Sequence, residues 1–198
     1  MTRAYNFSAG PAALPEPVLR QAQQELLEWG SARASVMEIS HRGAAFMAMA
    51  AEAEQDLRDL LAIPANYRVL FMQGGATQHF AQIPMNLARQ DQSADYVISG
   101  AWGEKAFAEA APHVRARICA SSAAGGFRDV PATADWKLDP QAAYVHYTTN
   151  ETIHGLELDC SRLPQTAVPL VADMSSHILS RPVDVSKYAM IYAGAQKN

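Results

Sequence analysis

The sequence predicts an α/β fold in which a mostly parallel sheet is flanked by helices. From about residue 69 onward, short apolar runs of strand length alternate with stretches of helical spacing. The composition is that of a globular chain, because 49% of the 198 residues are apolar and only 18% are charged. Strands that alternate with helices favour a parallel sheet with covered faces.

Two helices are expected before this alternating region. The first is predicted over residues 15–29, and Gly30 can provide the left-handed residue at its end. The second is predicted over residues 44–61, which are rich in Ala, Met and Glu, and it stops before Pro64. The apolar positions of the first helix recur at helical spacing: Val18, Leu19, Ala22, Leu26 and Leu27.

The alternating region predicts two further helices and a series of short strands. The helices are expected over residues 76–87 and 103–111, and Pro84 is expected to kink the first of them or stop it early. Each strand is a short apolar run. The predicted strands are residues 69–72, 96–98, 117–119, 143–147, 168–172 and 190–192.

Charge and composition exclude several classes of function. The net charge is -4 without any run rich in Lys and Arg, so nucleic acid is not expected as a partner. No apolar run approaches the roughly 18 residues that span a bilayer, and the N-terminus lacks the apolar core of a signal peptide. Cys119 and Cys160 form no CxxC pair, so we expect reduced thiols in a cytoplasmic protein.

Residues with useful chemistry follow several of the predicted strands. Ligands of an open α/β sheet bind beyond the carboxyl ends of its strands. The segments at these ends are 74–77, 100–102, 148–152, Asp173 and 194–197. We therefore expect a glycine-rich turn, an indole ring, hydroxyl groups, a carboxylate and a lysine to share one rim.

These groups fit pyridoxal 5'-phosphate. The amine of Lys197 can form a Schiff base with its aldehyde. The carboxylate of Asp173 can keep the pyridine nitrogen protonated, so that the ring accepts electrons, and Trp102 can stack on the ring. A glycine-rich turn that opens a helix offers N–H groups to the phosphate. Taken singly, each residue also has a plain structural interpretation as a surface lysine, a turn former, a turn or a core residue.

Several longer stretches make the interpretation specific, and together they span the sequence in order. They resemble the phosphoserine aminotransferases, a family of pyridoxal-phosphate enzymes. Residues 192–198 resemble the segment that contains the cofactor lysine of this family. The other stretches are residues 6–12, 35–43, 94–97, 150–153 and 180–184.

The resemblance implies a fold-type-I architecture and a homodimer with active sites at the subunit interface. It implies transfer of an amino group between glutamate and 3-phosphohydroxypyruvate, a phosphorylated 2-oxo acid, to give 2-oxoglutarate and phosphoserine. The family often also acts on the four-carbon analogue in vitamin B6 synthesis. Residues 1–15 would be an arm that belongs with the small domain, and residues 16–198 would be the first part of the large, cofactor-binding domain. Family members are nearly twice as long, so the chain alone is expected to be inactive.

The resemblance also implies roles for individual residues around the cofactor. Lys197 would hold the cofactor and move a proton between the substrate α-carbon and the cofactor. Asp173 would pair with the pyridine nitrogen, Trp102 would stack on the ring, and Thr152 would bond to the phenolic oxygen. The cofactor phosphate would be bound by Ala76, Thr77 and Gln196.

Two adjacent residues are implied at the substrate phosphate. His41 and Arg42 would contact it across the dimer interface, and arginine suits phosphate because it binds bidentately. Thr77 stands where some relatives carry an arginine, so phosphate binding would rest more heavily on Arg42. Ala9 stands where some relatives carry a serine, which removes one side-chain contact to the substrate. No metal site is expected.

The residues leave two alternatives open. The first is another fold-type-I enzyme, such as an alanine–glyoxylate transaminase or a cysteine desulfurase, which uses a lysine and an aspartate on the cofactor in the same way. A non-catalytic domain could keep the fold and bind a partner instead. The His41–Arg42 pair favours a phosphorylated substrate over the first alternative, and the presence of every cofactor residue argues against the second.

Overall fold

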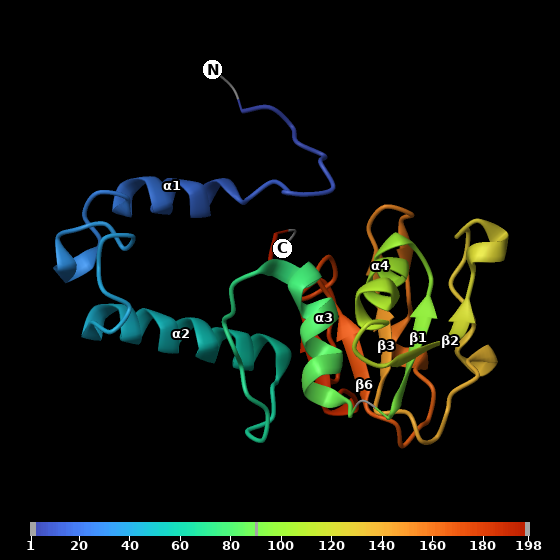
Figure 1. Cartoon of the computed structure of the whole chain (residues 1–198). Helices are drawn as coiled ribbons and strands as arrows, with labels where there is room; N and C mark the ends of the chain where they lie inside the picture. Colours follow the sequence, from blue (N-terminus) through green and yellow to red (C-terminus); the bar gives the residue numbers. More distant parts are fainter. Residues whose placement is uncertain (1–2, 90, 197–198) are drawn as a thin grey trace. The chain divides into compact units, whose positions relative to one another are not determined.

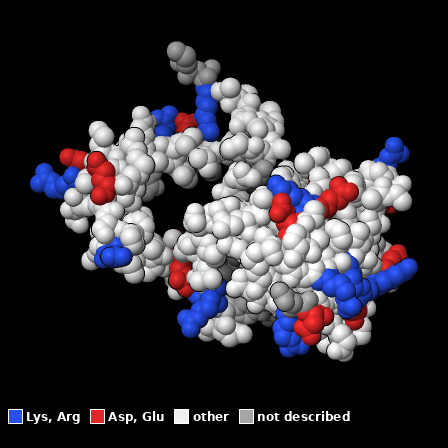
Figure 2. Space-filling view, in the orientation of Figure 1, with Lys and Arg blue, Asp and Glu red and all other residues white. Residues whose placement is uncertain are grey.

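The computed structural model describes residues 3–89 and 91–196. The chain divides into two compact units, residues 1–70 and residues 71–198. No helix in the described ranges is both long and apolar enough to cross a bilayer. Charged side chains on the face drawn in Figure 2 form small groups of both signs, without a broad patch of one sign.

The first unit contains helices α1 (Glu16–Glu25) and α2 (Ala44–Leu61). The predicted helix over 15–29 is therefore too long, because α1 ends at Glu25. Gly30 has a left-handed φ of 51°, but it opens a separate 3₁₀ turn instead of ending α1. Leu26 and Leu27 are exposed, so no packing supports a longer helix there. The prediction for α2 is confirmed at both ends.

The second unit contains a five-stranded sheet with the strand order β2-β1-β3-β6-β7, in which every pairing is parallel (Figure 1). The predicted parallel α/β fold is confirmed, with strand ends that differ by a few residues. The strands are β1 (Ser93–Ile98), β2 (Arg115–Ser121), β3 (Val145–Thr148), β6 (Leu170–Asp173) and β7 (Met190–Tyr192). A short antiparallel hairpin, β4 (Asn150–Glu151) and β5 (Leu156–Glu157), was not predicted, because two-residue strands carry no periodicity.

The predicted strand over residues 69–72 is wrong. Leu70, Phe71 and Met72 are 73%, 64% and 57% exposed, and the segment has no strand conformation. Its apolar side chains favour a strand, but a strand also needs a neighbour that accepts its backbone hydrogen bonds. None of the strands in the described part of the chain pairs with it.

Helices α3 (Gly75–Leu87) and α4 (Ala101–Ala110) pack on one face of the sheet (Figure 1). Helix α3 runs three residues past Pro84, so the proline lies in its last turn. Irregular segments and short 3₁₀ turns cover the other face, where Trp136, Leu158 and Met174 pack against the strands. Both faces are thus buried, which explains the nearly continuous apolar strands in the sequence.

A partly buried ion cluster joins β1, β2 and the loop before β3 at one end of the sheet. Asp95 on β1 is fully buried, and its Oδ1 lies 3.3 Å from the Arg117 guanidinium on β2. The same guanidinium lies 2.8 Å from Asp139, in the loop before β3, and the Asp139 N–H donates to Asp95 Oδ2 at 2.6 Å. Burial raises the pKa of Asp95, and the Asp139 N–H and the Arg117 charge oppose this shift.

The substitution Arg117→Met should destabilise the fold. It leaves the buried Asp95 carboxylate without its cation, which should cost roughly 1–3 kcal/mol of unfolding free energy. Urea unfolding followed by circular dichroism measures this loss. Arg115→Met is the matched control, because Arg115 lies on the same strand and is exposed. Equal stabilities of the two variants would show that the ion cluster contributes nothing.

Candidate functional site

A cavity of about 350 Å³ lies at the carboxyl edge of the sheet, within the second unit. It lies between the starts of α3 and α4 and the loops that follow β3, β6 and β7. Its volume is in the range of pockets that hold small ligands. Residues predicted from the sequence to bind a cofactor line it: Ala76, Thr77, Trp102, Thr152, Asp173 and Gln196.

The start of α3 forms one wall and offers free backbone donors. Gly74 has a φ of 102° and Gly75 a φ of 66°, values that favour glycine and let the chain turn sharply into the helix. No side chain caps this end among the described residues. The first N–H groups of a helix have no partner inside it, and they carry the positive end of the helix dipole. This wall is therefore suited to an anion.

The start of α4 is closed by a protein carboxylate. Glu151 on β4 accepts hydrogen bonds from the backbone N–H groups of Trp102 at 2.9 Å and Gly103 at 2.8 Å. A Cβ at Gly100 would lie 2.6 Å from the Glu151 carboxyl carbon, so only glycine leaves room for this contact. Burial raises the pKa of Glu151, and the two N–H donors oppose the shift. Glu151 thus fixes the backbone that carries the Trp102 ring.

Asp173 supplies the buried charge of the site. It ends β6 and is almost fully buried. Its Oδ1 accepts a hydrogen bond from the Ser175 N–H at 2.8 Å, and the Tyr192 hydroxyl also interacts electrostatically with its carboxylate. Burial raises the pKa of Asp173, while these donors and the nearby His79 ring lower it.

Hydroxyl groups form a third wall. The Thr152 hydroxyl donates to Ser176 Oγ at 2.8 Å, and Ser176 donates to the Asn150 carbonyl at 3.0 Å. The Thr148 hydroxyl is buried and has no hydrogen-bond partner within residues 3–89 and 91–196. A polar ligand in the cavity could bond to it, since a buried hydroxyl without a partner is costly.

The loop after β7 closes the cavity on the side of α3. The Gly194 N–H donates to Ser175 Oγ at 2.9 Å, and the Gln196 N–H donates to the Gly194 carbonyl at 2.8 Å. A Cβ at Gly194 would lie 3.4 Å from the Ala76 nitrogen, so this loop runs close to the start of α3. Lys197, the predicted cofactor lysine, lies outside the described residues.

His41 and Arg42 belong to the first unit. Both are exposed and lie in the turn before α2, where the Arg42 N–H donates to Ser40 Oγ at 3.2 Å. Neither side chain has an ion-pair partner among the described residues. Their role at a substrate phosphate stays a prediction.

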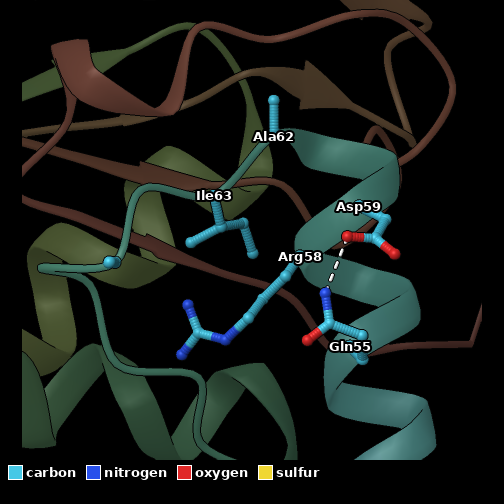
Figure 3. A pocket seen from close by; sticks show the side chains of 6 residues that line it. Gln55, Arg58, Asp59, Ala62 and Ile63 are labelled. Atoms are coloured by element: carbon cyan, nitrogen blue, oxygen red, sulfur yellow. Dashed lines mark hydrogen bonds between the residues drawn. The ribbon is translucent and has the colours of Figure 1, made fainter.

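A second hollow of about 500 Å³ lies at the end of α2 (Figure 3). Its polar side chains are engaged with one another. Gln55 donates to Asp59 at 2.7 Å, and the Arg58 guanidinium bonds to Glu54 at 2.8 Å and to the Tyr67 carbonyl at 3.2 Å. It contains none of the predicted site residues. No group of three or more metal-ligating side chains occurs in the described part of the chain.

Sequence reasoning missed three kinds of residue at the cavity. Glu151 lies in the segments 148–152 and 150–153 that the sequence singles out, but no role is predicted for its side chain. Lys105 was not noticed, although it follows Trp102 at helical spacing. Its Nζ lies 3.4 Å from Thr77 Oγ1 and 6.0 Å from the centre of the Trp102 ring. Tyr192 lies in a predicted strand and in the segment 192–198 that resembles the cofactor-lysine segment, but no role is predicted for its side chain, and nothing in a single sequence links it to Asp173.

Comparison with known proteins identifies the family. Residues 4–198 match the family model for class-V aminotransferases. The chain is 60% identical to the phosphoserine aminotransferases of Aromatoleum aromaticum and Stenotrophomonas maltophilia. All of the chain is matched, and it spans 56% and 55% of those relatives. The chain belongs to the class-V aminotransferase family.

Solved structures agree with this result. A phosphoserine aminotransferase from Bacillus circulans subsp. alkalophilus superposes with a TM-score of 0.95 at 47% identity, over 99% of this chain and 54% of that one. A phosphoserine aminotransferase from Trichomonas vaginalis with bound pyridoxal phosphate gives 0.89 at 42% identity, over 99% and 55%. Within the family, the chain is thus similar to phosphoserine aminotransferases.

The substitution Glu151→Gln should loosen the start of α4. The amide has one acceptor oxygen, so it leaves one of the two backbone N–H groups without a partner, which should cost roughly 1–3 kcal/mol. Hydrogen exchange at the Trp102 and Gly103 amides should accelerate by at least about tenfold. Glu104→Gln makes the same change of charge on an exposed residue of the same helix turn and should leave both amides protected. Unchanged exchange in Glu151→Gln would contradict the capping role.

Proposed function

We propose that this chain is the cofactor-binding part of a pyridoxal-phosphate-dependent phosphoserine aminotransferase. The reaction would move an amino group between glutamate and 3-phosphohydroxypyruvate, and the same site would accept the four-carbon analogue. One observation carries the proposal: a single cavity joins an uncapped helix start to a buried carboxylate. The names of the 60% identical relatives support the choice of substrate.

The lining of the cavity supports this cofactor at its phosphate and at its pyridine nitrogen. The phosphate would bind to the N–H groups at the start of α3, where Ala76 and Thr77 lie. The pyridine nitrogen would face Asp173, and the Trp102 indole would cover the ring. The unpartnered Thr148 hydroxyl supplies one further group for a polar ligand. Bound pyridoxal phosphate supplies an aldehyde for a covalent bond to an amine and a ring that accepts electrons.

The residues of the chain would then divide the work. Lys197 would hold the cofactor and move a proton at the substrate α-carbon. Asp173 in its ionised form would keep the pyridine nitrogen protonated. Thr152 would donate to the phenolic oxygen when it exchanges its present bond to Ser176. His41 and Arg42 would bind the substrate phosphate.

We also propose a homodimer. Tyr5, Phe7, Leu27 and Met37 of the first unit are highly exposed, and neither α1 nor α2 contains a buried residue. Large exposed apolar side chains in such number indicate a surface that another protein surface covers. The proposal includes an arm at residues 1–15 that belongs with a small domain and a large domain that begins at residue 16. The free thiols Cys119 and Cys160 suit the cytoplasm.

The full-length protein should transfer the amino group of phosphoserine to 2-oxoglutarate far faster than that of alanine. Without a phosphate, the phosphate-binding groups stay unpaired, so kcat/KM for alanine should be at least about a hundredfold lower. Glutamate formation measures both rates. Lys197→Ala should abolish the reaction, and Lys187→Ala is the matched control. Comparable rates with alanine would reject the proposed substrate class and favour another aminotransferase.

Lys105→Met should weaken cofactor binding without altering the fold. The Lys105 ammonium group lies beside Thr77 at the predicted phosphate site, but it is exposed, so its contribution is that of a surface ion pair. We expect the Kd for pyridoxal phosphate to rise by up to about fivefold at low salt, and the difference to shrink at high salt. Spectroscopic titration gives both values. A Kd equal to that of Lys187→Met at low salt would exclude this role.

A further inference from the structure

Three polar side chains, those of Asp173, Tyr192 and His146, form a chain across the sheet. Tyr192 on β7 is paired in register with Asp173 on β6, and its hydroxyl interacts electrostatically with the carboxylate. His146 lies on β3, on the other side of β6, and its Nε2 lies 2.7 Å from the Tyr192 hydroxyl oxygen. These three side chains therefore span three neighbouring strands and end at the cavity.

This chain is enclosed. His146, Tyr192 and Asp173 are 1%, 6% and 3% exposed. The Phe80 ring meets both His146 and Tyr192 edge-on, with ring centres 6.3 Å and 6.2 Å apart, and the His79 ring stacks on Tyr192 at 5.5 Å. Buried polar groups have to form hydrogen bonds with one another, because bulk water does not reach them.

The protons of the chain can be assigned from its donors and acceptors. Burial lowers the pKa of His146 to about 3, so its ring is neutral near neutral pH. Burial raises the pKa of Tyr192 well above its usual value, so its hydroxyl keeps the proton. That single proton goes to the carboxylate, the acceptor that can carry charge, and the hydroxyl oxygen then accepts the N–H of His146 Nε2.

The assignment leaves His146 Nδ1 as the unprotonated nitrogen. That atom has no hydrogen-bond partner among the described residues. The only unpaired group is then a lone pair, whereas the other tautomer would bury an N–H without an acceptor. The directions of all the bonds are therefore consistent, and each donor points toward Asp173.

We propose that Tyr192 and His146 are positioning residues that hold the Asp173 carboxylate ionised and aimed into the cavity. The inference rests on the proposed function for the identity of the ligand. In this proposal, Tyr192 donates directly to the carboxylate. His146 acts through Tyr192, because an N–H that bonds to the hydroxyl oxygen makes the hydroxyl a stronger donor. The Ser175 N–H holds Oδ1 from the following loop.

The pH dependence follows from these bonds. A donor to the ionised form lowers the pKa of Asp173, so removal of the Tyr192 hydroxyl raises it and the carboxylate takes up a proton at a higher pH. The other titratable groups that interact with Asp173 in the described structure are His79 on α3 and Glu151 on β4, and both are retained in the variants. The acid limb of cofactor binding should therefore move to higher pH.

The first measurement needs no cofactor. In the full-length protein labelled with carbon-13 at aspartate carboxyls, the Asp173 signal is assigned with Asp173→Asn and titrated with pH. Tyr192→Phe should raise its midpoint by about one pH unit, the size of one lost charge-assisted hydrogen bond. His146→Leu should raise it by less, and His146→Gln, which keeps an N–H donor, should restore part of the difference.

Tyr147→Phe is the matched control. Tyr147 is also a buried tyrosine of the sheet, and its hydroxyl bonds to the Tyr188 hydroxyl at 2.9 Å in the other core. It should lower stability without moving the Asp173 midpoint. If Tyr192→Phe moves the midpoint no more than Tyr147→Phe, the positioning role is overturned, even when both variants are less stable.

The second measurement is the affinity for pyridoxal phosphate across the acid range. A rise in the pH of the acid limb in Tyr192→Phe, parallel to the carboxyl midpoint, supports the inference. If the pH midpoint of the Asp173 carboxyl moves but the acid limb of pyridoxal-phosphate binding does not, the link from Tyr192 and His146 to the ligand is overturned. A wild-type protein that binds no pyridoxal phosphate refutes the proposed function, and the carboxyl titration then still decides whether Tyr192 and His146 control Asp173.

Discussion

The buried carboxylate of Asp173 is the constraint on which the site depends. A charge that is removed from water destabilises a fold strongly unless donors or an opposite charge surround it. The Ser175 N–H donates to it on the protein side, the Tyr192 hydroxyl interacts with it electrostatically, and the remaining side faces the cavity. A protonated ring nitrogen there would complete the surroundings. A cationic ligand in the cavity would therefore account for the burial of a carboxylate at its wall.

The two helix starts at the cavity are used differently, although they are chemically alike. Each presents free N–H groups and a positive dipole end. At α4 the protein fills this position with Glu151, which fixes the backbone of Trp102. At α3 no side chain takes the position in the described structure, and Gly74 and Gly75 keep it open. The start of α3 is therefore open to an anion, whereas the start of α4 is already filled by the protein.

The rim could be predicted from the sequence because it depends on a general property of parallel sheets. Carboxyl ends of parallel strands meet at one edge, so residues after the strands were expected together before any side chain was placed. Glu151 and Tyr192 could not be found this way. The role of Glu151 depends on which way a short hairpin turns, and Tyr192 looks like any aromatic residue in a buried strand.

The two wrong elements have the same cause. Residues 69–72 have the apolar side chains of a strand, and Leu26 and Leu27 have the spacing of a helix, but neither segment has a packing partner in the described structure. The spacing of apolar residues indicates which conformation would bury the segment. It does not show whether another part of the fold packs against that segment, and a single sequence does not answer this question.

The choice of substrate has to rest on residues outside the shared fold. An alanine–glyoxylate aminotransferase from Nostoc sp. shares the fold with a TM-score of 0.62 at only 16% identity, so the sheet does not select a phosphorylated substrate. The anion site of α3 would be taken by the cofactor phosphate, and a second phosphate, with a charge of about -1.5 to -2, needs cations of its own. Arg42 is exposed and has no ion-pair partner among the described residues. It therefore remains available for a ligand, whereas Arg58 and Arg117 are already bound to carboxylates.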